Sequence, residues 1–278
     1  MSRTLSVLLL PSVLAAVSYD ELVALKRVHQ SGASYCPPAT VSAWSCKPCV
    51  ASGSALSHVT YLQNTTSEVV GFVGLDSGAS EIVIAFRGSE TFENWLDDFD
   101  VALTPFGCSN CSVHEGWLRD YRSIRAQLHA SVSALLEISP GAMVAFSGHS
   151  LGAALSELAA YDFAVSQFAP IKNIYTFGAP RTGNPSWAAA WASAVLTSAD
   201  RFRAVHYLDP VPHLPPTIFD YLHAPTEVWY YSTENSTGAF VVCSGTNGED
   251  PACSDSVFPD RPKDHSYYLG VELGEVAC

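Results

Sequence analysis

Apolar and polar residues alternate along this chain with two different periods, which predict both helices and strands. Residues 19–32 and 117–137 carry apolar side chains three and four positions apart, as one face of a helix requires. Residues 69–75 and 81–86 are β-branched runs separated by the turn sequence 76–79. We therefore expect two helices and an antiparallel hairpin in the first half of the chain.

Short apolar runs alternate with helical patterns from residue 143 onward. The predicted strands are 143–147, 174–177 and 202–207, and the predicted helices are 153–168 and 186–195. This alternation indicates a mostly parallel sheet covered by helices, so the predicted fold class is α/β. The chain has no internal repeat and no Gly/Ser linker, and the prolines between 210 and 225 are typical of a surface loop rather than a hinge. We therefore expect one domain.

Composition narrows the classes of protein to consider. With 278 residues, 48% of them hydrophobic and 15% charged, the chain can bury a large core and is neither disordered nor fibrous. Its formal net charge of -13 would repel a polyanion, which argues against nucleic acid as a partner. A neutral substrate fits this charge better.

The first 18 residues have the layout of a secretory signal peptide. Arg3 precedes a mostly apolar stretch at 5–16, and small residues then favour cleavage between 15 and 18. The apolar stretch is shorter than the ~18 residues that a membrane span needs, and no other stretch reaches that length. We expect an exported domain of residues 19–278 with no integral membrane segment; a buried N-terminal helix is the alternative.

Eight cysteines indicate four disulfides in an exported chain. They are Cys36, Cys46, Cys49, Cys108, Cys111, Cys243, Cys253 and Cys278. Spacing alone does not define the connectivity, although bridges between close neighbours would leave Cys36 for Cys278. Two close pairs have the Cys-x-x-Cys spacing of zinc ligands, but they lie much farther apart than the ~15–20 residues of a zinc ribbon, so we expect no metal. Glycosylation sequons begin at Asn64, Asn110 and Asn235.

The sequence Gly148-His149-Ser150-Leu151-Gly152 matches the Gly-x-Ser-x-Gly elbow of serine hydrolases. A predicted strand ends before it and a predicted helix begins after it, so Ser150 would lie on a sharp turn that only flanking glycines leave room for. A serine hydroxyl needs a histidine to take its proton and a carboxylate to orient that histidine. Both are expected downstream of Ser150, whereas His149 is expected to be structural.

Asp209 is the best candidate for the carboxylate, because it closes the predicted strand 202–207 at the sheet edge where catalytic loops gather. The alternatives are Asp200, which precedes the strand, Asp220, which lies in the proline-rich loop, and Asp264, which adjoins the expected base. We expect these three carboxylates to be solvated.

His265 is the best candidate for the base, because its C-terminal loop comes late enough to return to the sheet edge. His206 lies within a predicted strand and is expected to be a core residue. His213 and His223 remain as alternatives. The sequence therefore predicts a triad of Ser150, Asp209 and His265.

Six motifs in order resemble the fungal class 3 lipases, the family of the Rhizomucor and Thermomyces lipases and of a related feruloyl esterase. They lie at 84–89, 113–117, 148–152, 175–184, 209–216 and 264–268. The resemblance covers nearly all of the mature chain and implies an α/β-hydrolase fold with the same triad. It also implies an oxyanion hole formed by Ser89 and the Leu151 amide.

The resemblance bears on the disulfides as well. It implies the pairs Cys36–Cys278, Cys46–Cys49 and Cys243–Cys253, as in the lipases. Cys108 and Cys111 instead look like the feruloyl esterase branch. The family precedent is therefore divided between two kinds of ester hydrolase.

The segment after Ser89 predicts an amphipathic helix. One face is apolar and the rest is acidic. The apolar residues are Phe92, Trp95, Leu96 and Phe99. A helix packed on the core is one interpretation, but the lipase resemblance favours a mobile lid that exposes this face at an oil surface. The feruloyl esterase branch has a substrate-contacting tyrosine near the end of this segment, where this chain has Val101.

These patterns together predict a secreted lipase that hydrolyses neutral acyl esters at a lipid–water interface, with no cofactor. The nearest alternative is a feruloyl or other plant-wall esterase, which would act on soluble aromatic esters. The alternative from another class is a catalytically inactive binding protein on the same fold. The oligomeric state is not predicted by any of these patterns.

Overall fold

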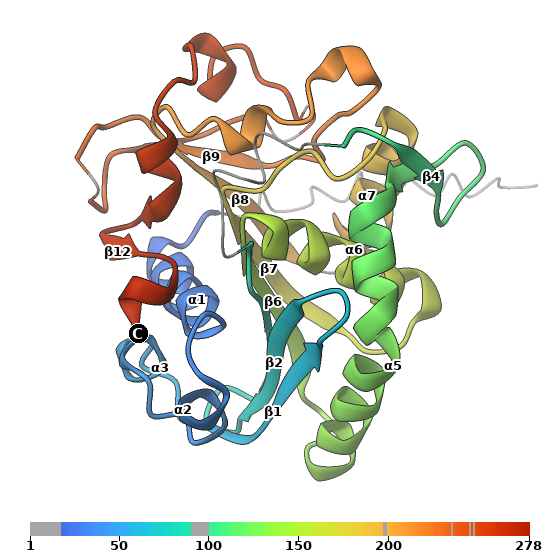
Figure 1. Ribbon diagram of the computed structural model, residues 1–278, viewed down its shortest axis with the longest axis vertical. Coiled ribbons are helices and arrows are strands. Elements are labelled where there is room, and N and C mark those ends of the chain that lie inside the picture. The colour runs from blue at the N-terminus through green and yellow to red at the C-terminus, as the bar shows by residue number, and fades with distance from the viewer. Residues whose placement is uncertain (1–17, 90–99, 197–198, 235, 245, 247) are drawn as a thin grey trace, which may run out of the picture.

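The centre of the protein is an eight-stranded sheet (Figure 1) in the order β1-β2-β3-β6-β7-β8-β9-β10. The computed structural model describes residues 18–89, 100–196, 199–234, 236–244, 246 and 248–278. Strands β3, β6, β7, β8 and β9 are parallel to one another. The antiparallel pairs β1/β2, β2/β3 and β9/β10 lie toward the two edges. This mixed sheet is the α/β fold class predicted from the sequence.

The strands of this sheet are longest at the β1 edge and shortest at the β10 edge. They are β1 (Leu56–Asn64), β2 (Val69–Asp76), β3 (Glu81–Phe86), β6 (Met143–His149), β7 (Ile171–Phe177), β8 (Asp200–His206), β9 (Glu227–Tyr230) and β10 (Phe240–Val242). Two small ladders lie outside it, namely β4 (Leu103–Pro105) with β5 (Ser112–His114), and β11 (Tyr267–Tyr268) with β12 (Val271–Glu272).

Helices cover both faces of the sheet (Figure 1). They are α1 (Glu21–Ala33), α2 (Pro38–Ser42), α3 (Lys47–Ala51), α5 (Glu115–Ile138), α6 (Leu151–Ser166) and α7 (Pro185–Leu196). The larger core lies between the sheet and α5, α6 and α7. A second core packs α1 against β7, β8 and β9, and a third packs α2 and α3 against the antiparallel strands. Burial on both faces explains why the central strands are continuous apolar runs.

The hairpin and the alternating elements predicted from the sequence are confirmed, with shifts of a few residues at their ends. The sequence did not predict the two edge strands of this sheet, β1 and β10. Strand β1 has a bulge between Ser57 and Thr60 and mixes buried with exposed positions. Strand β10 is exposed or half-buried throughout. Such edge strands have little apolar surface to hide, so they leave little periodic signal.

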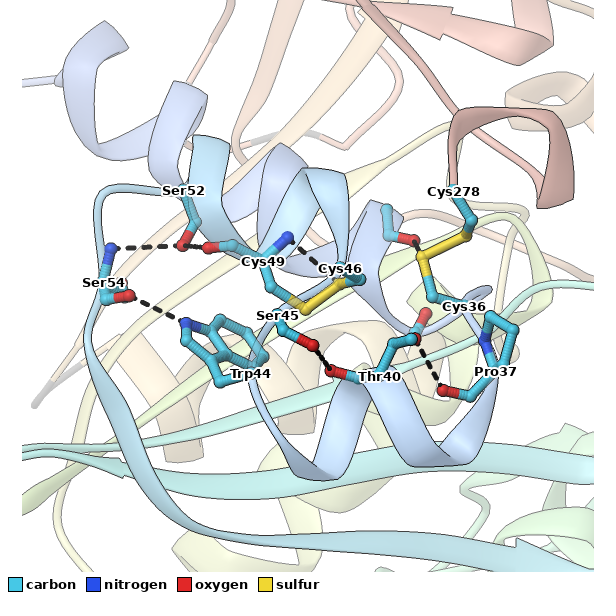
Figure 2. The surroundings of a disulfide bond; sticks show 12 residues. Cys36, Pro37, Thr40, Trp44, Ser45, Cys46, Cys49, Ser52, Ser54 and Cys278 are labelled. Atoms are coloured by element: carbon cyan, nitrogen blue, oxygen red, sulfur yellow. Dashed lines mark hydrogen bonds between the residues drawn. A yellow bond between two sulfur atoms is a disulfide. The ribbon is translucent and has the colours of Figure 1, made fainter.

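All eight cysteines are paired. The disulfides are Cys36–Cys278, Cys46–Cys49, Cys108–Cys111 and Cys243–Cys253. The first of them joins the loop after α1 to the last residue of the chain, beside the Cys46–Cys49 bridge (Figure 2). Because these sulfurs are used in disulfides, the zinc alternative has no thiolate ligands.

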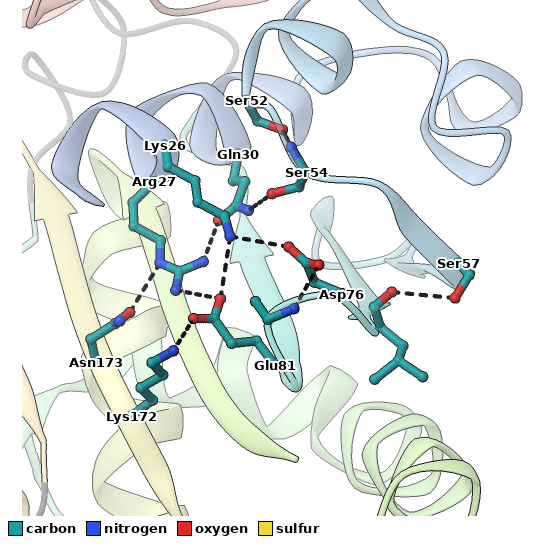
Figure 3. A network of polar contacts seen from close by, with 12 residues as sticks. Lys26, Arg27, Gln30, Ser52, Ser54, Ser57, Asp76, Glu81, Lys172 and Asn173 are labelled. Atoms are coloured by element: carbon teal, nitrogen blue, oxygen red, sulfur yellow. Dashed lines mark hydrogen bonds and ion pairs between the residues drawn. The ribbon is translucent and has the colours of Figure 1, made fainter. Parts of the chain in front are cut away.

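The end of the sheet away from the predicted catalytic loops carries a buried charge network (Figure 3). Glu81 accepts from Arg27 at 2.7 Å and from Lys172 at 2.6 Å, and Lys26 lies 3.6 Å away. Burial alone would raise the pKa of Glu81, but Arg27, Lys172 and Lys26 together lower this pKa to about 2. The network ties α1 to β3 and β7.

The predicted signal peptide lies almost wholly outside the described residues, since the description begins at residue 18. Among the helices that the structure describes, none is long and apolar enough to cross a membrane. Of the sequon asparagines, Asn110 is exposed and Asn64 is half-buried with its amide donating to Ser123 O at 3.3 Å. Asn235 is outside the described residues.

Candidate active site

The predicted nucleophile Ser150 lies between the end of β6 and the start of α6. Its backbone has φ 58° and ψ -131°, a region that residues other than glycine rarely adopt. Its amide donates to Phe177 O at 3.0 Å, which fixes the turn against β7. The strained turn predicted from the Gly-x-Ser-x-Gly motif is therefore present.

The two glycines of the motif are required by close packing. A Cβ on Gly148 would lie 2.2 Å from the carbonyl oxygen of Gly152. A Cβ on Gly152 would lie 2.1 Å from the carbonyl oxygen of Phe86 in β3. Both distances are far inside van der Waals contact. A larger residue at 148 would distort the turn itself, and one at 152 would force the turn away from β3.

Asp209 lies in the turn just after β8 and is fully buried. Its Oδ2 is 2.9 Å from Nδ1 of His265 and also accepts a hydrogen bond from the Tyr268 hydroxyl, while its Oδ1 accepts from the Val211 amide at 2.9 Å. Burial would raise the pKa of Asp209, but His265 and these donors lower this pKa below its usual value. The carboxylate is therefore held ionised and in a fixed orientation toward His265.

His265 lies in a short 3₁₀ turn, Pro262–Ser266, that returns to the sheet edge from the C-terminal segment. It is 2% exposed. A Cβ on Gly178, whose φ is +59°, would lie 2.8 Å from the His265 ring. Gly178 follows Phe177, whose carbonyl accepts the Ser150 amide hydrogen. The segment 177–178 therefore lies against both Ser150 and His265.

The alternative acids and bases are not part of this arrangement. Asp200 and Asp220 are exposed, as expected. The expectation that Asp264 is solvated is wrong, because Asp264 is 5% exposed and its Oδ2 accepts from the Leu208 amide at 3.3 Å. It buttresses the turn after β8 instead of facing the solvent.

The alternative histidines also have other partners. His206 is a core residue, as predicted, with Nδ1 3.0 Å from Asp264 O. His213 lies 3.4 Å from Asp255, and His223 is buried with Nε2 2.7 Å from Pro212 O. Of the four candidate histidines, the structure brings His265 to Asp209.

The loop before Ser89, one of the two predicted oxyanion donors, lies directly against the elbow. A Cβ on Gly88 would lie 2.9 Å from Cβ of Ser150. The amide of Gly88 donates to the Tyr35 hydroxyl at 3.0 Å. The other predicted donor, the Leu151 amide, is in the first turn of α6, where backbone N–H groups point out of the helix.

His149 connects this loop to His265, the predicted base. Its Nε2 lies 2.8 Å from His265 O, and because a carbonyl can only accept, Nε2 carries the hydrogen. Burial, and then the neighbouring His265, lower the pKa of His149 to about 3, so its ring is neutral and Nδ1 accepts from the Tyr35 hydroxyl at 2.7 Å. His149 is structural, as predicted. It links the loop at Gly88, through Tyr35, to the backbone of His265.

Sequence reasoning did not find Tyr35, Gly178 or Tyr268. Tyr268 is three residues after His265 inside the motif at 264–268, so its spacing was the available signal. Tyr35 is 114 positions from its partner His149, and no local pattern indicates such a contact. The predicted lid residues Phe92, Trp95, Leu96 and Phe99 lie outside the described residues.

The described residues offer little to a metal ion. One group of side chains, Glu227 with Cys243 and Cys253, brings ligand atoms within 4.8 Å of one another in the part of the chain that the structure describes. Its two sulfurs form a disulfide, which removes them as thiolate ligands. The group also lies on β9 and the segment after it, away from Ser150.

The parallel sheet, the strained serine after β6 and the Asp209–His265 pair define the class of α/β hydrolases. The family model for class 3 lipases matches residues 83–219. A lipase from Rhizomucor miehei is 33% identical over 253 residues, which is 88% of this chain and 67% of the relative. The chain belongs to the class 3 lipase family.

Two further comparisons agree with this membership. A secreted mono- and diacylglycerol lipase A from Penicillium cyclopium is 31% identical over 193 residues, or 69% of this chain. The match spans about three fifths (61%) of that relative. A solved triacylglycerol lipase, described as having a serine protease triad as its catalytic centre, superposes with a TM-score of 0.81 at 32% identity, covering 92% of this chain and 95% of its own.

Proposed function

We propose that this protein is a secreted serine esterase that hydrolyses the acyl ester bonds of triacylglycerols and related neutral lipids. The observation that carries the proposal is the 2.9 Å contact between Asp209 and His265 beside the strained elbow of Ser150. The relatives add support, because they are named lipase and mono- and diacylglycerol lipase.

The first chemical step transfers the acyl group to the enzyme. The Ser150 hydroxyl attacks the carbonyl carbon of the ester, and its proton moves to Nε2 of His265. Asp209 holds Nδ1–H and stabilises the imidazolium that forms. The ester C–O bond then breaks, and the alcohol leaves with the proton from His265. The product of this step is an acyl-Ser150 enzyme.

The second step releases the acid and restores the serine. His265 takes a proton from water, the resulting hydroxide attacks the acyl carbonyl, and Ser150 leaves with that proton. In both steps Ser89 and the Leu151 amide donate to the oxyanion, and loss of one such donor typically costs ~3 kcal/mol of transition-state stabilisation. The buried, fixed position of Gly88 against Ser150 supports the placement of this loop.

We assign the lipid–water interface as the place of action on the basis of the amphipathic segment after Ser89. Its apolar stripe, Phe92, Trp95, Leu96 and Phe99, would be covered in water and exposed at an oil surface. Secretion is supported by the N-terminal pattern, by four disulfides and by relatives that are named secreted.

A feruloyl esterase is the second candidate, and the Cys108–Cys111 disulfide is the observation in its favour. Val101 counts against it, because that branch has a substrate-contacting tyrosine there. This candidate would cleave soluble aromatic esters and would show no rate increase when a lipid emulsion forms.

The triad is tested by Ser150→Ala, with Ser131→Ala on the exposed side of α5 as a matched control. Ser150→Ala should lower kcat by at least about a thousandfold and abolish labelling by a serine-reactive phosphonate, with unchanged circular dichroism. Ser131→Ala should retain both. Hydrolysis above a few per cent in the Ser150 variant would contradict the assignment.

The substrate class is tested by comparing a long-chain triglyceride with methyl ferulate as each concentration is raised. A rate that jumps when the triglyceride passes its solubility limit supports the interfacial lipase. Cleavage of the ferulate alone would instead support a feruloyl esterase. It would also contradict the interpretation of the segment after Ser89 as a lid.

A further inference from the structure

Strand β8 carries two arginines whose side chains are buried in the protein. Arg201 and Arg203 are each 3% exposed. They alternate with Phe202, which belongs to the core beneath α1, so both arginines point to the opposite face, toward α6 and α7. This is the same strand that ends just before Asp209, but the arginines lie at its beginning and middle.

Arg201 is a buried cation without a hydrogen-bonding partner. Its Nε, Nη1 and Nη2 have no acceptor among the described residues. One face of the guanidinium lies 4.8 Å from the centre of the Trp191 ring, which offers a cation–π contact but accepts none of the five N–H groups. A buried, unpaired guanidinium is strongly destabilising, so these donors require an acceptor that the described part of the chain does not supply.

The space for such an acceptor is a small cavity of about 10 Å³ at this guanidinium, with room for one small particle. It is lined by Glu157 of α6, by Trp191 of α7, by Thr176 of β7, by both arginines and by the segment before β9. Its volume excludes phosphate, sulfate and carboxylate anions.

The charges around the cavity leave Arg201 as the uncompensated group. Arg203 is paired, with Nη2 2.8 Å from Glu227 and 2.9 Å from Gly248 O, although its Nε and Nη1 have no partner among the described residues. Glu157 accepts from the Thr182 hydroxyl at 2.6 Å. Burial is the main reason that the pKa of Glu157 is raised to about 7.

Two more distant ionisable groups, Glu249 and His223, interact electrostatically with Arg203 rather than with Arg201. Glu249 binds Arg181 at 2.8 Å, and buried His223 has a pKa that burial, and then Arg203, hold well below the usual value. Both therefore keep a constant charge around neutral pH. Burial lowers the pKa of Arg201 itself to about 9, against the raising effect of Glu157. As the pH rises, Glu157, with its pKa of about 7, is therefore the first of the two groups to change its charge.

We propose that this cavity binds a single halide ion, chloride under ordinary conditions, against the guanidinium of Arg201. A halide is small, carries one negative charge and accepts hydrogen bonds from several directions, which is what the three nitrogens of Arg201 need. When Glu157 is protonated, the anion supplies the missing counter-charge. When Glu157 is ionised, its carboxylate competes with the anion. Binding is therefore tighter at acidic than at alkaline pH.

The site is separate from the ester chemistry but belongs to the same framework. Glu157 is on α6, whose first turn holds Ser150, and Arg201 is on β8, which leads to Asp209. Halide binding therefore stabilises the folded protein without contacting the substrate, and unfolding is the direct readout.

The experiment measures the melting temperature of the purified protein in sodium chloride, sodium bromide and sodium gluconate at equal ionic strength. Gluconate is too large for the cavity. At pH 5.5 we expect Tm to rise by about 3–5 °C for each tenfold increase in chloride above its Kd, with no such rise in gluconate. At pH 8.5 the chloride effect should be several-fold smaller.

Variants locate the effect. Arg201→Leu should remove the difference between chloride and gluconate, and since a buried unpaired charge is replaced by an apolar side chain, the variant is expected to fold. Arg119→Leu, at a side chain that is 75% exposed, is the matched control and should retain the difference. Glu157→Gln should retain it at both pH values.

Crystals soaked in bromide give an independent reading. Anomalous scattering should show one bromide at Arg201 in the native protein and none there in Arg201→Leu. Equal Tm values in chloride and gluconate for the native protein, or a crystal with only water at Arg201, would overturn the proposal. A chloride effect that survives Arg201→Leu would overturn it as well.

Discussion

The hydroxyl of Tyr35 donates to Nδ1 of His149 across 2.7 Å and accepts the amide hydrogen of Gly88. Tyr35 comes just after α1, whereas His149 and Gly88 belong to the elbow and to the loop beside it. The opposite nitrogen of His149 binds the backbone of His265. One continuous chain of hydrogen bonds therefore positions the proposed oxyanion loop and the proposed base relative to Ser150.

Tyr35→Phe removes the hydroxyl from this hydrogen-bond chain. The Nδ1 atom of His149 and the amide of Gly88 then lose their shared partner. We expect kcat to fall about tenfold, because such a loss typically costs 1–3 kcal/mol, while KM changes little. Tyr19→Phe is the matched control, since its hydroxyl binds Tyr230 at 2.7 Å outside the site. A fall in KM alone, or equal losses in the two variants, would contradict a positioning role for Tyr35.

Asp209→Asn keeps the shape of the side chain but removes the charge that orients His265. By analogy with other serine triads, kcat should fall about 10⁴-fold with the fold intact. Asp220→Asn is the control, because Asp220 is exposed and its φ of 63° is one that asparagine tolerates. Similar activity in the two variants would mean that Asp209 is not the acid.

Gly178→Ala places a methyl group 2.8 Å from the His265 ring, at a backbone φ of +59°. The ring must move, so we expect kcat to fall at least about a hundredfold, as small displacements of a catalytic group can cause. Gly141→Ala is the control, since nothing lies within 4 Å of its added carbon. Steady-state kinetics on a soluble ester, with melting curves for both variants, separate loss of alignment from loss of stability.

Glu81→Gln tests the network that joins α1 to the sheet. Because the pKa of Glu81 is about 2 in the folded protein against an ordinary value of 4.5, its charge stabilises the fold above pH 4.5, and this contribution is lost as the pH falls toward 2. The variant should be destabilised by about 3 kcal/mol at pH 7, with a smaller difference at pH 3.

Urea unfolding of the native protein and of Glu81→Gln at pH 7, 4.5 and 3 measures this difference. Glu137→Gln, at an exposed position on α5, is the control and should unfold like the native protein at each pH. A difference that stays constant from pH 7 to pH 3 would show that the charge of Glu81 is not what stabilises the network.

Local patterns predicted the parts of the molecule that local physics determines. The elbow is one case, because the close approach of Gly148 to Gly152 and the strained φ of Ser150 involve residues that are neighbours in sequence. The central strands are another, since burial on both faces produces continuous apolar runs. The order of Ser150, Asp209 and His265 followed from the known order of such triads along the chain.

Contacts between distant segments could not be predicted in the same way. Asp264 is polar and adjoins a loop histidine, so it was expected to be solvated, yet the turn after β8 buries it. Arg201 lies just before the predicted strand 202–207, and no local pattern indicates that Trp191 of α7 packs against its guanidinium. In both cases a second element packs over the side chain and buries it. The sequence near the residue does not indicate this contact.

The Cys36–Cys278 disulfide, with a sequence separation of 242, closes most of the chain into a covalent ring. A protease that cuts one peptide bond anywhere within this ring opens it but releases no fragment. The nicked protein would gain the mass of one water and would separate into two pieces only after reduction. Exposed loops such as the one at Asp220 can therefore be cleaved without separating Ser150 from His265.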